Sequence, residues 1–238
     1  MGLRADIGTA AGKAVYVRRL FATIADRYDL ITVVLSYGQD RRWKRRLIAM
    51  AGPLEDRRVL DLACGTGDLG LLASAAGADV VALDLTARMV DLARLKVRQA
   101  GAARMRVLVG DMMAIPLPDA CVDVVTTGYG LRNVPDLDRA IAEIQRVLKP
   151  AGRLVSLDFN RPSQPLLRGA YLAYLSAVGS ALGWTLHRDP DTYRYIPESI
   201  RLYPGAEAVV ESLRAAGFQH ARWHRVLGGL LAIHVADK

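Results

Sequence analysis

The chain has 238 residues, of which 52% are hydrophobic and 24% are charged, and its formal net charge is +8. A composition so rich in apolar residues excludes an intrinsically disordered chain, and the length suits a single α/β domain. Cys64 and Cys121 are too few and too far apart for a disulfide framework, so we predict free thiols in a reducing compartment. The basic excess predicts an anionic partner, either nucleic acid or a lipid surface.

Residues 1–50 are predicted to form an N-terminal cap of amphipathic helices. Apolar side chains recur there at helical spacing, at Val17, Leu20, Phe21 and Ile24. The first six residues lack the apolar core of an export signal, so we expect a cytoplasmic protein. The densest basic run, residues 41–46, places Trp43 among four Arg and one Lys. It is either a solvated helix face or a contact for an anionic surface.

Residues 51–162 alternate short apolar runs with helical stretches. The predicted strands cover residues 59–62, 80–83, 105–109, 122–126 and 152–157. Helices are predicted between them, the clearest at residues 87–99 and 137–148. This alternation indicates βαβ units and a parallel sheet with helices on both faces.

The alternation breaks after Pro162 and resumes only near residue 205. We interpret residues 163–204 as a helical lid that folds, with the N-terminal helices, over the carboxyl edge of the sheet. Its uncharged stretch, residues 169–186, just reaches the length of a membrane span but is rich in small residues, so a buried or membrane-resting helix is favoured. Residues 205–238 add a helix and two strands. The whole chain is predicted to be one doubly wound, Rossmann-like α/β domain with a mostly parallel seven-stranded sheet.

The clearest binding motif is a strand that runs straight into a glycine turn and a helix, at residues 59–68. Gly65 and Gly67 allow the backbone to turn tightly and to approach a ligand. Gly70 completes the Gly-x-Gly-x-x-Gly spacing of a dinucleotide-binding loop, so binding of NAD is an alternative to consider. The acidic residues Asp61 and Asp68, which flank the loop, would repel a pyrophosphate but suit the α-ammonium group of a methionine moiety.

Two further acidic residues follow the next two predicted strands. Asp84 lies 19 residues after Gly65 and can accept hydrogen bonds from both ribose hydroxyls. Asp111 can accept a hydrogen bond from an adenine amino group, with Met112 packed on the ring. These acids could instead serve only to cap the strand ends. Three of them in order, Asp61, Asp84 and Asp111, together with the glycine loop favour S-adenosylmethionine as the cofactor.

The fourth predicted strand leads into residues 126–135, which face the transferable methyl group in such a fold. The Asn/Asp-Pro-Pro-aromatic motif of nucleic-acid amino methylases is absent there. Cys64 and Cys121 are not placed as a cytosine-attacking nucleophile would be. We therefore predict no nucleic-acid partner, and an RNA methyltransferase is disfavoured.

The chain resembles the ubiquinone/menaquinone biosynthesis C-methyltransferases from about residue 17 to 235. The resemblance rests on FATIADRYD at residues 21–29, GLRNV at residues 130–134 and DTYRYIPESI at residues 191–200. It implies a class I methyltransferase fold and C-methylation of a polyprenyl quinol ring, with demethylmenaquinol as the expected substrate. The choice between naphthoquinol and benzoquinol stays open. A methyltransferase for another apolar or phenolic molecule, or a non-catalytic adenosylmethionine-binding subunit, are the alternatives.

The motifs and the resemblance together give the expected site residues. The expected cofactor-binding residues are Asp61, Gly65, Thr66, Gly67, Asp84, Leu85, Asp111, Met112 and Gly128. The expected substrate-binding residues are Tyr28, Tyr129, His187, Tyr193 and Arg194. Arg132 is expected to stabilise a phenolate and Asn133 to orient a hydroxyl or water, while the base is Asp158, His187 or a water. No metal is expected.

A polyprenyl tail needs an apolar channel. We expect the N-terminal helices to wall it together with Leu166, Leu167, Tyr171, Leu172, Tyr174 and Leu175. The basic run near Trp43 could rest on anionic headgroups. Transient membrane contact and a possible homodimer complete the expected partners.

Overall fold

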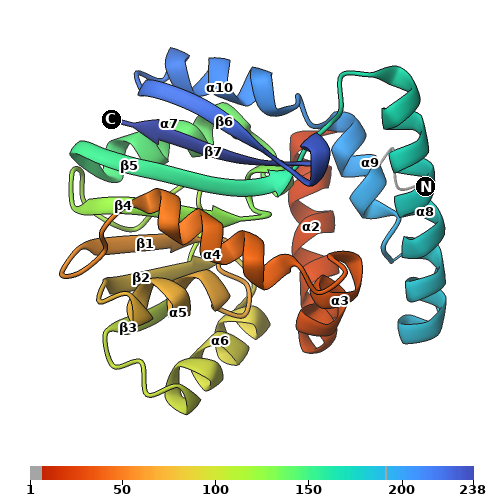
Figure 1. Ribbon diagram of the computed structural model, residues 1–238. Helices are drawn as coiled ribbons and strands as arrows, with labels where there is room; N and C mark the ends of the chain where they lie inside the picture. The colour runs from red at the N-terminus through yellow and green to blue at the C-terminus, as the bar shows by residue number, and fades with distance from the viewer. Residues whose placement is uncertain (1–6, 191) are drawn as a thin grey trace.

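The computed structural model describes residues 7–190 and 192–238, so Asp191, the first residue of one of the motifs above, lies outside them. A seven-stranded sheet in the order β3-β2-β1-β4-β5-β7-β6 forms the centre (Figure 1). Its strands are β1 (Arg58–Leu62), β2 (Asp79–Asp84), β3 (Met105–Val109), β4 (Val122–Gly128), β5 (Leu148–Phe159), β6 (Gln219–Val226) and β7 (Leu231–Asp237). Neighbouring strands pair in parallel except β7, which is antiparallel to both β5 and β6. The predicted fold class is confirmed.

Helices cover both faces of the sheet (Figure 1). One layer consists of α4 (Asp40–Ala51), α5 (Asp68–Ala75) and α6 (Ala87–Gln99), and the other of α7 (Leu137–Val147) and α10 (Ala206–Ala215). Successive residues of β1 show why both layers are needed, since Val59 packs into one core and Leu60 into the other. Strands that are apolar on both faces can be buried only in such a sandwich.

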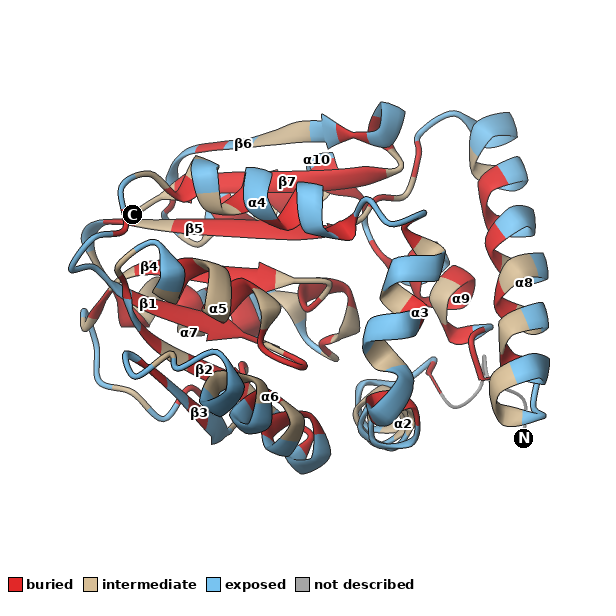
Figure 2. Ribbon diagram, turned by 60° about the horizontal axis from the view of Figure 1, so that its bottom comes forward, coloured by how far each residue is buried: buried red, intermediate tan, exposed pale blue. Residues whose placement is uncertain are grey.

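A third group of helices lies beyond the carboxyl edge of the central strands (Figure 2). It consists of α2 (Ala10–Ile24), the short η1 (Ala25–Arg27), α3 (Tyr28–Leu35), α8 (Pro165–His187) and α9 (Tyr195–Leu202). Ile24, Ile31 and Tyr193 form one buried cluster that joins the N-terminal helices to the insertion. We call α2, η1 and α3 the cap.

The cap is shorter than the predicted residues 1–50. Helix α4 lies on the sheet, where Leu47 is fully buried and Trp43 is only 8% exposed, so it belongs to the core. The segment 163–204 folds as α8 and α9. Small residues of α8 allow close packing, since a Cβ on Gly183 would meet the carbonyl oxygen of Asp189. Within the described residues, no helix is long and apolar enough to cross a membrane.

Candidate active site

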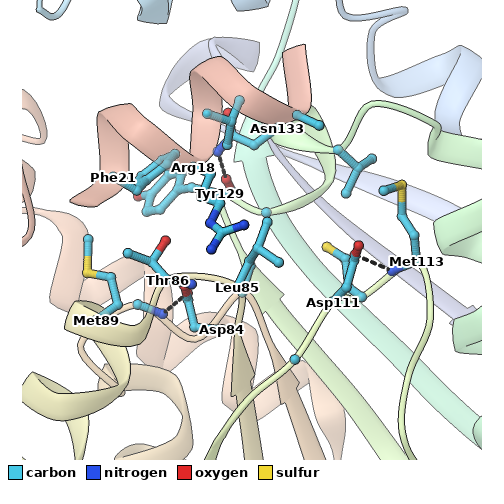
Figure 3. A pocket seen from close by; sticks show the side chains of 18 of the residues that line it. Arg18, Phe21, Asp84, Leu85, Thr86, Met89, Asp111, Met113, Tyr129 and Asn133 are labelled. Carbon is cyan, nitrogen blue, oxygen red and sulfur yellow. Dashed lines mark hydrogen bonds between the residues drawn. The ribbon is translucent and has the colours of Figure 1, made fainter. Parts of the chain in front are cut away.

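The main cavity opens at the carboxyl edge of β1, β2 and β4 and encloses about 800 Å³, its mouth included. Six of the predicted cofactor residues line it: Gly65, Asp84, Leu85, Asp111, Met112 and Gly128. The cap closes the opposite side with Val17, Arg18 and Phe21, so the cavity lies between the sheet and the cap (Figure 3). We call it the cofactor cavity.

Asp84 ends β2 and is fixed by two backbone amides. Its Oδ2 accepts a hydrogen bond from the N–H of Gly65 and its Oδ1 one from the N–H of Thr86, both at 2.8 Å (Figure 3). A carboxylate has about four acceptor positions, so two remain for the hydroxyl groups of a ribose. Burial raises the pKa of Asp84, which a pair of donor hydroxyls would counteract.

The glycine loop needs its glycines for backbone shape and for space. Gly65 and Gly67 have φ angles of 54° and 90°, in the left-handed region that side chains disfavour. A Cβ on Gly65 would lie 3.4 Å from the ring of Tyr28, so the cap tyrosine sits directly over the loop. A ligand can therefore contact bare backbone on one side and an aromatic ring on the other.

The strand-end residues after β3 also face this cavity. Asp111 accepts a hydrogen bond from the N–H of Met113 at 2.8 Å, which fixes its carboxylate (Figure 3). Met112 is 7% exposed and packs into the core while it lines the cavity. The two residues thus present an acceptor and an apolar surface side by side, as an adenine ring requires.

A smaller space of about 300 Å³ adjoins the cofactor cavity and is lined by Asp61, Thr66 and Gly128. The carboxylate of Asp61 accepts hydrogen bonds from Thr126 Oγ1 at 2.8 Å and from the N–H of Gly70 at 3.0 Å. Burial nevertheless raises the pKa of Asp61 to about 7. An ammonium group bound here would supply the missing positive charge.

Two lysines neutralise the other acid beside the loop. Lys44 Nζ lies 2.9 Å from one oxygen of Asp68, and Lys96 Nζ lies 2.9 Å from the other. Although burial acts in the opposite direction, these two cations lower the pKa of Asp68 to about 2. Asp68 is therefore occupied by lysines, and Asp61 is left as the carboxylate for an ammonium group. The site therefore fits S-adenosylmethionine: Asp84 can accept from the ribose, Asp111 from the adenine and Asp61 from the ammonium group, and the glycine loop lets the ligand approach the backbone.

A second cavity, the ring chamber, lies between the cofactor cavity and the insertion and encloses about 640 Å³. Its walls are largely apolar, but they include Arg132 and Asn133 from η2 (Leu131–Asn133) after β4. Tyr28, Tyr129 and Asn133 line both cavities. The ring chamber and the cofactor cavity therefore share a wall that carries the predicted catalytic loop.

Arg132 is almost fully buried, at 4% exposure. Its Nε lies 3.2 Å from Asp158 Oδ1, and its Nη1 donates to Ser199 Oγ. Its guanidinium carbon lies 5.2 Å from the ring centre of Phe159, which helps to hold the cation in an apolar chamber. In the described part of the chain Nη2 makes no hydrogen bond, so the cation keeps donors for a ligand.

Asp158 does not support the expected role of general base. It is 1% exposed, lines neither cavity, and accepts hydrogen bonds from the N–H groups of Arg132 and Phe159 as well as from Arg132 Nε. A carboxylate held by three donors orients the arginine rather than receiving a substrate proton. These contacts favour a positioning role for Asp158.

Two expected substrate residues lie outside the chamber. His187 hydrogen-bonds with the hydroxyl of Tyr193 at 2.8 Å but lines neither cavity, and Arg194 is exposed at the start of α9. Tyr193 itself lines the chamber, so His187 contributes by holding that ring. A base at His187 is therefore not supported.

Asn133 is fixed between two elements. Its Nδ2 donates to the carbonyl of Tyr129 at 2.7 Å, and its Oδ1 accepts from the hydroxyl of Tyr195 at 2.9 Å. Tyr129 in turn donates its hydroxyl to Asp40 at 2.8 Å, which anchors the loop to α4. The amide of Asn133 thus keeps one orientation at the shared wall.

Sequence reasoning missed Lys13, which ties the cap to this loop. Its Nζ donates to the carbonyl oxygens of Arg132, at 2.9 Å, and Val134, at 2.7 Å. Burial, followed by the nearby Arg132 cation, lowers the pKa of Lys13 to about 8. The contact joins residues 119 positions apart, so no local pattern could have revealed it. Arg18, which reaches into the cofactor cavity (Figure 3), and Tyr195 were missed for the same reason.

This sheet order, with a glycine loop after β1 and acidic residues after β2 and β3, defines an S-adenosylmethionine-dependent class I methyltransferase. Solved structures agree on the fold. A SAM-dependent methyltransferase from Aquifex aeolicus matches with a TM-score of 0.60 and 21% identity, over 82% of this chain and 88% of its own. A second, from Mesorhizobium loti, matches with a TM-score of 0.60 and 16% identity, over 82% of this chain and 96% of its own. Among the described residues, no group of three His, Cys, Asp or Glu side chains could hold a metal ion.

The profile of the ubiE/COQ5 methyltransferase family matches residues 9–238, and the chain belongs to this family. The demethylmenaquinone methyltransferase of Thermus thermophilus is 41% identical over 92% of this chain and 100% of its own length. The ubiquinone/menaquinone biosynthesis C-methyltransferase UbiE of Rubrivivax gelatinosus is 38% identical over 93% of this chain and 86% of its own length. The predicted family and cofactor are thereby confirmed.

Proposed function

We propose that the protein methylates a ring carbon of a polyprenyl quinol, with demethylmenaquinol as the substrate and menaquinol as the product. The observation that carries the proposal is the wall shared by the cofactor cavity and the apolar ring chamber: Asn133 lines both cavities, and its neighbour Arg132 lines the chamber. The names of the relatives in Thermus thermophilus and Rubrivivax gelatinosus support both the reaction and the quinol substrate.

The side chains of the chamber suit a phenolic ring. When bound, S-adenosylmethionine supplies an electrophilic methyl group on its sulfonium. A hydroquinol hydroxyl has a pKa near ~10, and losing its proton makes the adjacent ring carbon nucleophilic. The Arg132 guanidinium can hold the resulting phenolate oxygen, while Asn133 orients the neighbouring hydroxyl. With Asp158 occupied by Arg132, the hydroxyl proton passes to water before transfer. After transfer the methylated ring carbon loses its proton to water and the phenolate oxygen takes one back, so one proton is released in total.

The aromatic residues position the ring. Tyr28 and Tyr129 line both cavities and border the place where ring and methyl group meet. Burial raises the pKa of Tyr28 to about 12, so it stays neutral and acts as an apolar wall and hydrogen-bond donor. Tyr193 closes the far side of the chamber, held by His187. An in-line approach at about 3–3.5 Å needs this kind of confinement more than it needs a strong base.

The isoprenoid tail has a separate space. A third cavity, the tail groove, encloses about 690 Å³ and adjoins the ring chamber at Leu35 and Phe159, which line both. Four of the predicted channel residues line it: Leu167, Tyr171, Tyr174 and Leu175. Leu166 and Leu172 lie outside it. We propose that the ring enters the chamber while the tail lies in this groove, so the membrane that holds the tail must be met at least transiently.

The test is methyl transfer by the purified protein. Labelled S-adenosylmethionine and short-tailed naphthoquinol or benzoquinol substrates should give a quinol heavier by one methylene, with the naphthoquinol favoured. Mass spectrometry of the product identifies the methylated carbon. Cofactor binding without product from either quinol would contradict the proposal and identify a non-catalytic binding subunit.

A further inference from the structure

Helix α3 carries an exposed apolar stripe that the methyl-transfer site does not use. Leu30, Val33 and Val34 are 54%, 49% and 41% exposed, and Tyr37 just after the helix is 65% exposed. Their spacing of three, four and seven residues places them on one side of the helix. Water thus meets a row of large apolar side chains on a helix that also lines the ring chamber, a pattern that marks contact surfaces.

Helix α8 presents a matching surface. Its exposed side chains are all uncharged: Leu166, Leu167, Tyr174 and Trp184 are the large ones, and the rest are Gly, Ala, Pro or Thr. Surface helices of globular proteins usually carry charged residues on the outer face. Helix α8 has 23 residues, and its outer face carries no exposed charge and only the half-buried Arg168, so it is suited to an apolar medium rather than to water.

The two apolar surfaces form one face. Helix α9 lies between α3 and α8 in the ribbon views (Figures 1 and 2), but Ile31 of α3 shares an apolar cluster with Leu182 and Leu186 of α8. The rings of Tyr37 and Tyr174 also stack at 6.3 Å between centres. Tyr37, Leu167 and Tyr174 also line the tail groove, as does Leu227, which is 50% exposed. The groove therefore opens on this face, which we call the α3–α8 face.

Cations border the face. Arg41 and Arg42 begin α4, four and five residues after Tyr37, and Arg45 follows one turn later; all three are exposed. In the ranges that the structure describes, none of the three forms an ion pair. Trp43, expected to anchor at the interface, is instead buried and lines the tail groove. The basic run thus contributes arginines to the rim, while the apolar anchors come from α3 and α8.

We infer that the α3–α8 face is the surface with which the protein rests on a membrane containing anionic lipid. Apolar side chains in the middle and unpaired arginines at the edge match acyl chains and phosphate headgroups. The inference rests on the proposed function for its purpose, since a tail drawn from the bilayer would pass directly into the groove. A second copy of the chain would cover the apolar part but would leave the arginines without a counter-charge.

Vesicle co-sedimentation at about 0.15 M salt tests this inference, because lower salt exaggerates surface charge effects. The vesicles are phosphatidylcholine with or without phosphatidylglycerol, and they contain no quinol. Leu30→Glu with Val33→Glu should abolish binding to both. Arg41→Gln with Arg42→Gln should weaken binding to the anionic vesicles alone, by about fivefold for each charge. The matched controls on α6 and β3, Leu95→Glu and Arg98→Gln with Arg106→Gln, should bind like the unaltered protein.

Tryptophan emission reports which face touches lipid. Trp184 is 64% exposed on α8, so anionic vesicles should shift its emission to the blue, and Trp184→Phe should remove the shift. Equal sedimentation of all variants would overturn the inference. So would a dimer that Leu30→Glu with Val33→Glu converts to monomer without any vesicle binding by the unaltered protein. Because no quinol is present, failure of the proposed reaction would leave these results unchanged.

Discussion

The two halves of the active site are built in different ways. The cofactor half lies on the ends of β1, β2, β3 and β4, and its key carboxylates are fixed by backbone amides two to nineteen residues away, as at Asp84 and Asp111. The substrate half lies outside the sheet, on the cap, η2 and the insertion. Its contacts join distant segments, such as Lys13 to Arg132 and Tyr195 to Asn133.

This difference separates the part of the site that many methyltransferases share from the part that selects the substrate. The carboxylates of the cofactor site are fixed by the strand ends, and the cap only closes over them, so many methyltransferases can share this arrangement. A substrate site held by helix-to-loop contacts can change with the insertion while the sheet stays constant. We therefore expect mutations to divide cleanly, with cofactor affinity following the strand ends and turnover following the distant contacts.

The largest effect is expected from Arg132→Lys. The substitution keeps the charge but loses the planar donors that both Asp158 and a phenolate use, so kcat should fall by about 100-fold. Cofactor affinity, measured by calorimetry, should stay within a few-fold. Alanine is unsuitable, since it would leave Asp158 buried without its cation and destabilise the fold by about 3–5 kcal/mol. Turnover close to that of the unaltered enzyme would remove Arg132 from the reaction.

Asp84→Asn should act on the opposite half. Loss of a charge-assisted hydrogen bond of about 1.5–3 kcal/mol predicts a 10- to 100-fold weaker binding of S-adenosylmethionine. Calorimetry gives the affinity, and kcat at saturating cofactor should change little. Asp138→Asn, on the exposed side of α7, is the matched control. An unchanged affinity would mean that the ribose lies elsewhere.

The pH dependence of cofactor binding is a further test of the cofactor half of the site. Burial raises the pKa of Asp61 to about 7, so below that pH the residue is protonated and cannot pair with an ammonium group. Affinity should therefore fall as the pH drops, by about eightfold between pH 7.5 and pH 6. Titration calorimetry at each pH measures it. Asp61→Asn should bind more weakly and show no such fall, whereas an identical pH profile would place the ammonium away from Asp61.

Lys13→Met should produce the smallest effect, and that effect should fall on quinol binding alone. It removes two hydrogen bonds between the cap and the loop of Arg132, and we expect a KM for quinol about fivefold higher with cofactor affinity unchanged. Lys13→Arg should restore part of the loss, because a guanidinium can reach the same carbonyl oxygens. If both variants lose cofactor and quinol binding equally, Lys13 serves only the stability of the cap.

The sequence predicted the cofactor half well because its rules are local. A strand followed by Gly65 and Gly67, and acids that end the next strands, occupy positions that the topology of a parallel sheet dictates. The strand boundaries follow for the same reason, since apolar runs buried on both faces are short and distinct. The family motif also led to Arg132 and Asn133 on the chamber wall.

The remaining errors concern side-chain partners. Asp158 and His187 have the chemistry of a base, but the three donors around Asp158 and the hydroxyl beside His187 come from other segments. Trp43 was placed at the surface because its neighbours are charged. The helical spacing of Trp43, Leu47 and Ala51, all buried, shows that the chain turns this residue inward.

Ion pairs between the cap and helix α6 bear on how we expect used cofactor to leave. Asp26 bonds to Arg88, at 3.0 Å from its Nε, and Asp29 lies 2.6 Å from Lys96; both acids are about half exposed or more. Such exposed pairs contribute less than about 1 kcal/mol each, so they add only a weak latch to the buried cluster of Ile24, Ile31 and Tyr193 that holds the cap. We therefore expect dissolved salt, which screens this latch, to loosen the cap over residues 7–35 and to speed the exchange of spent for fresh cofactor.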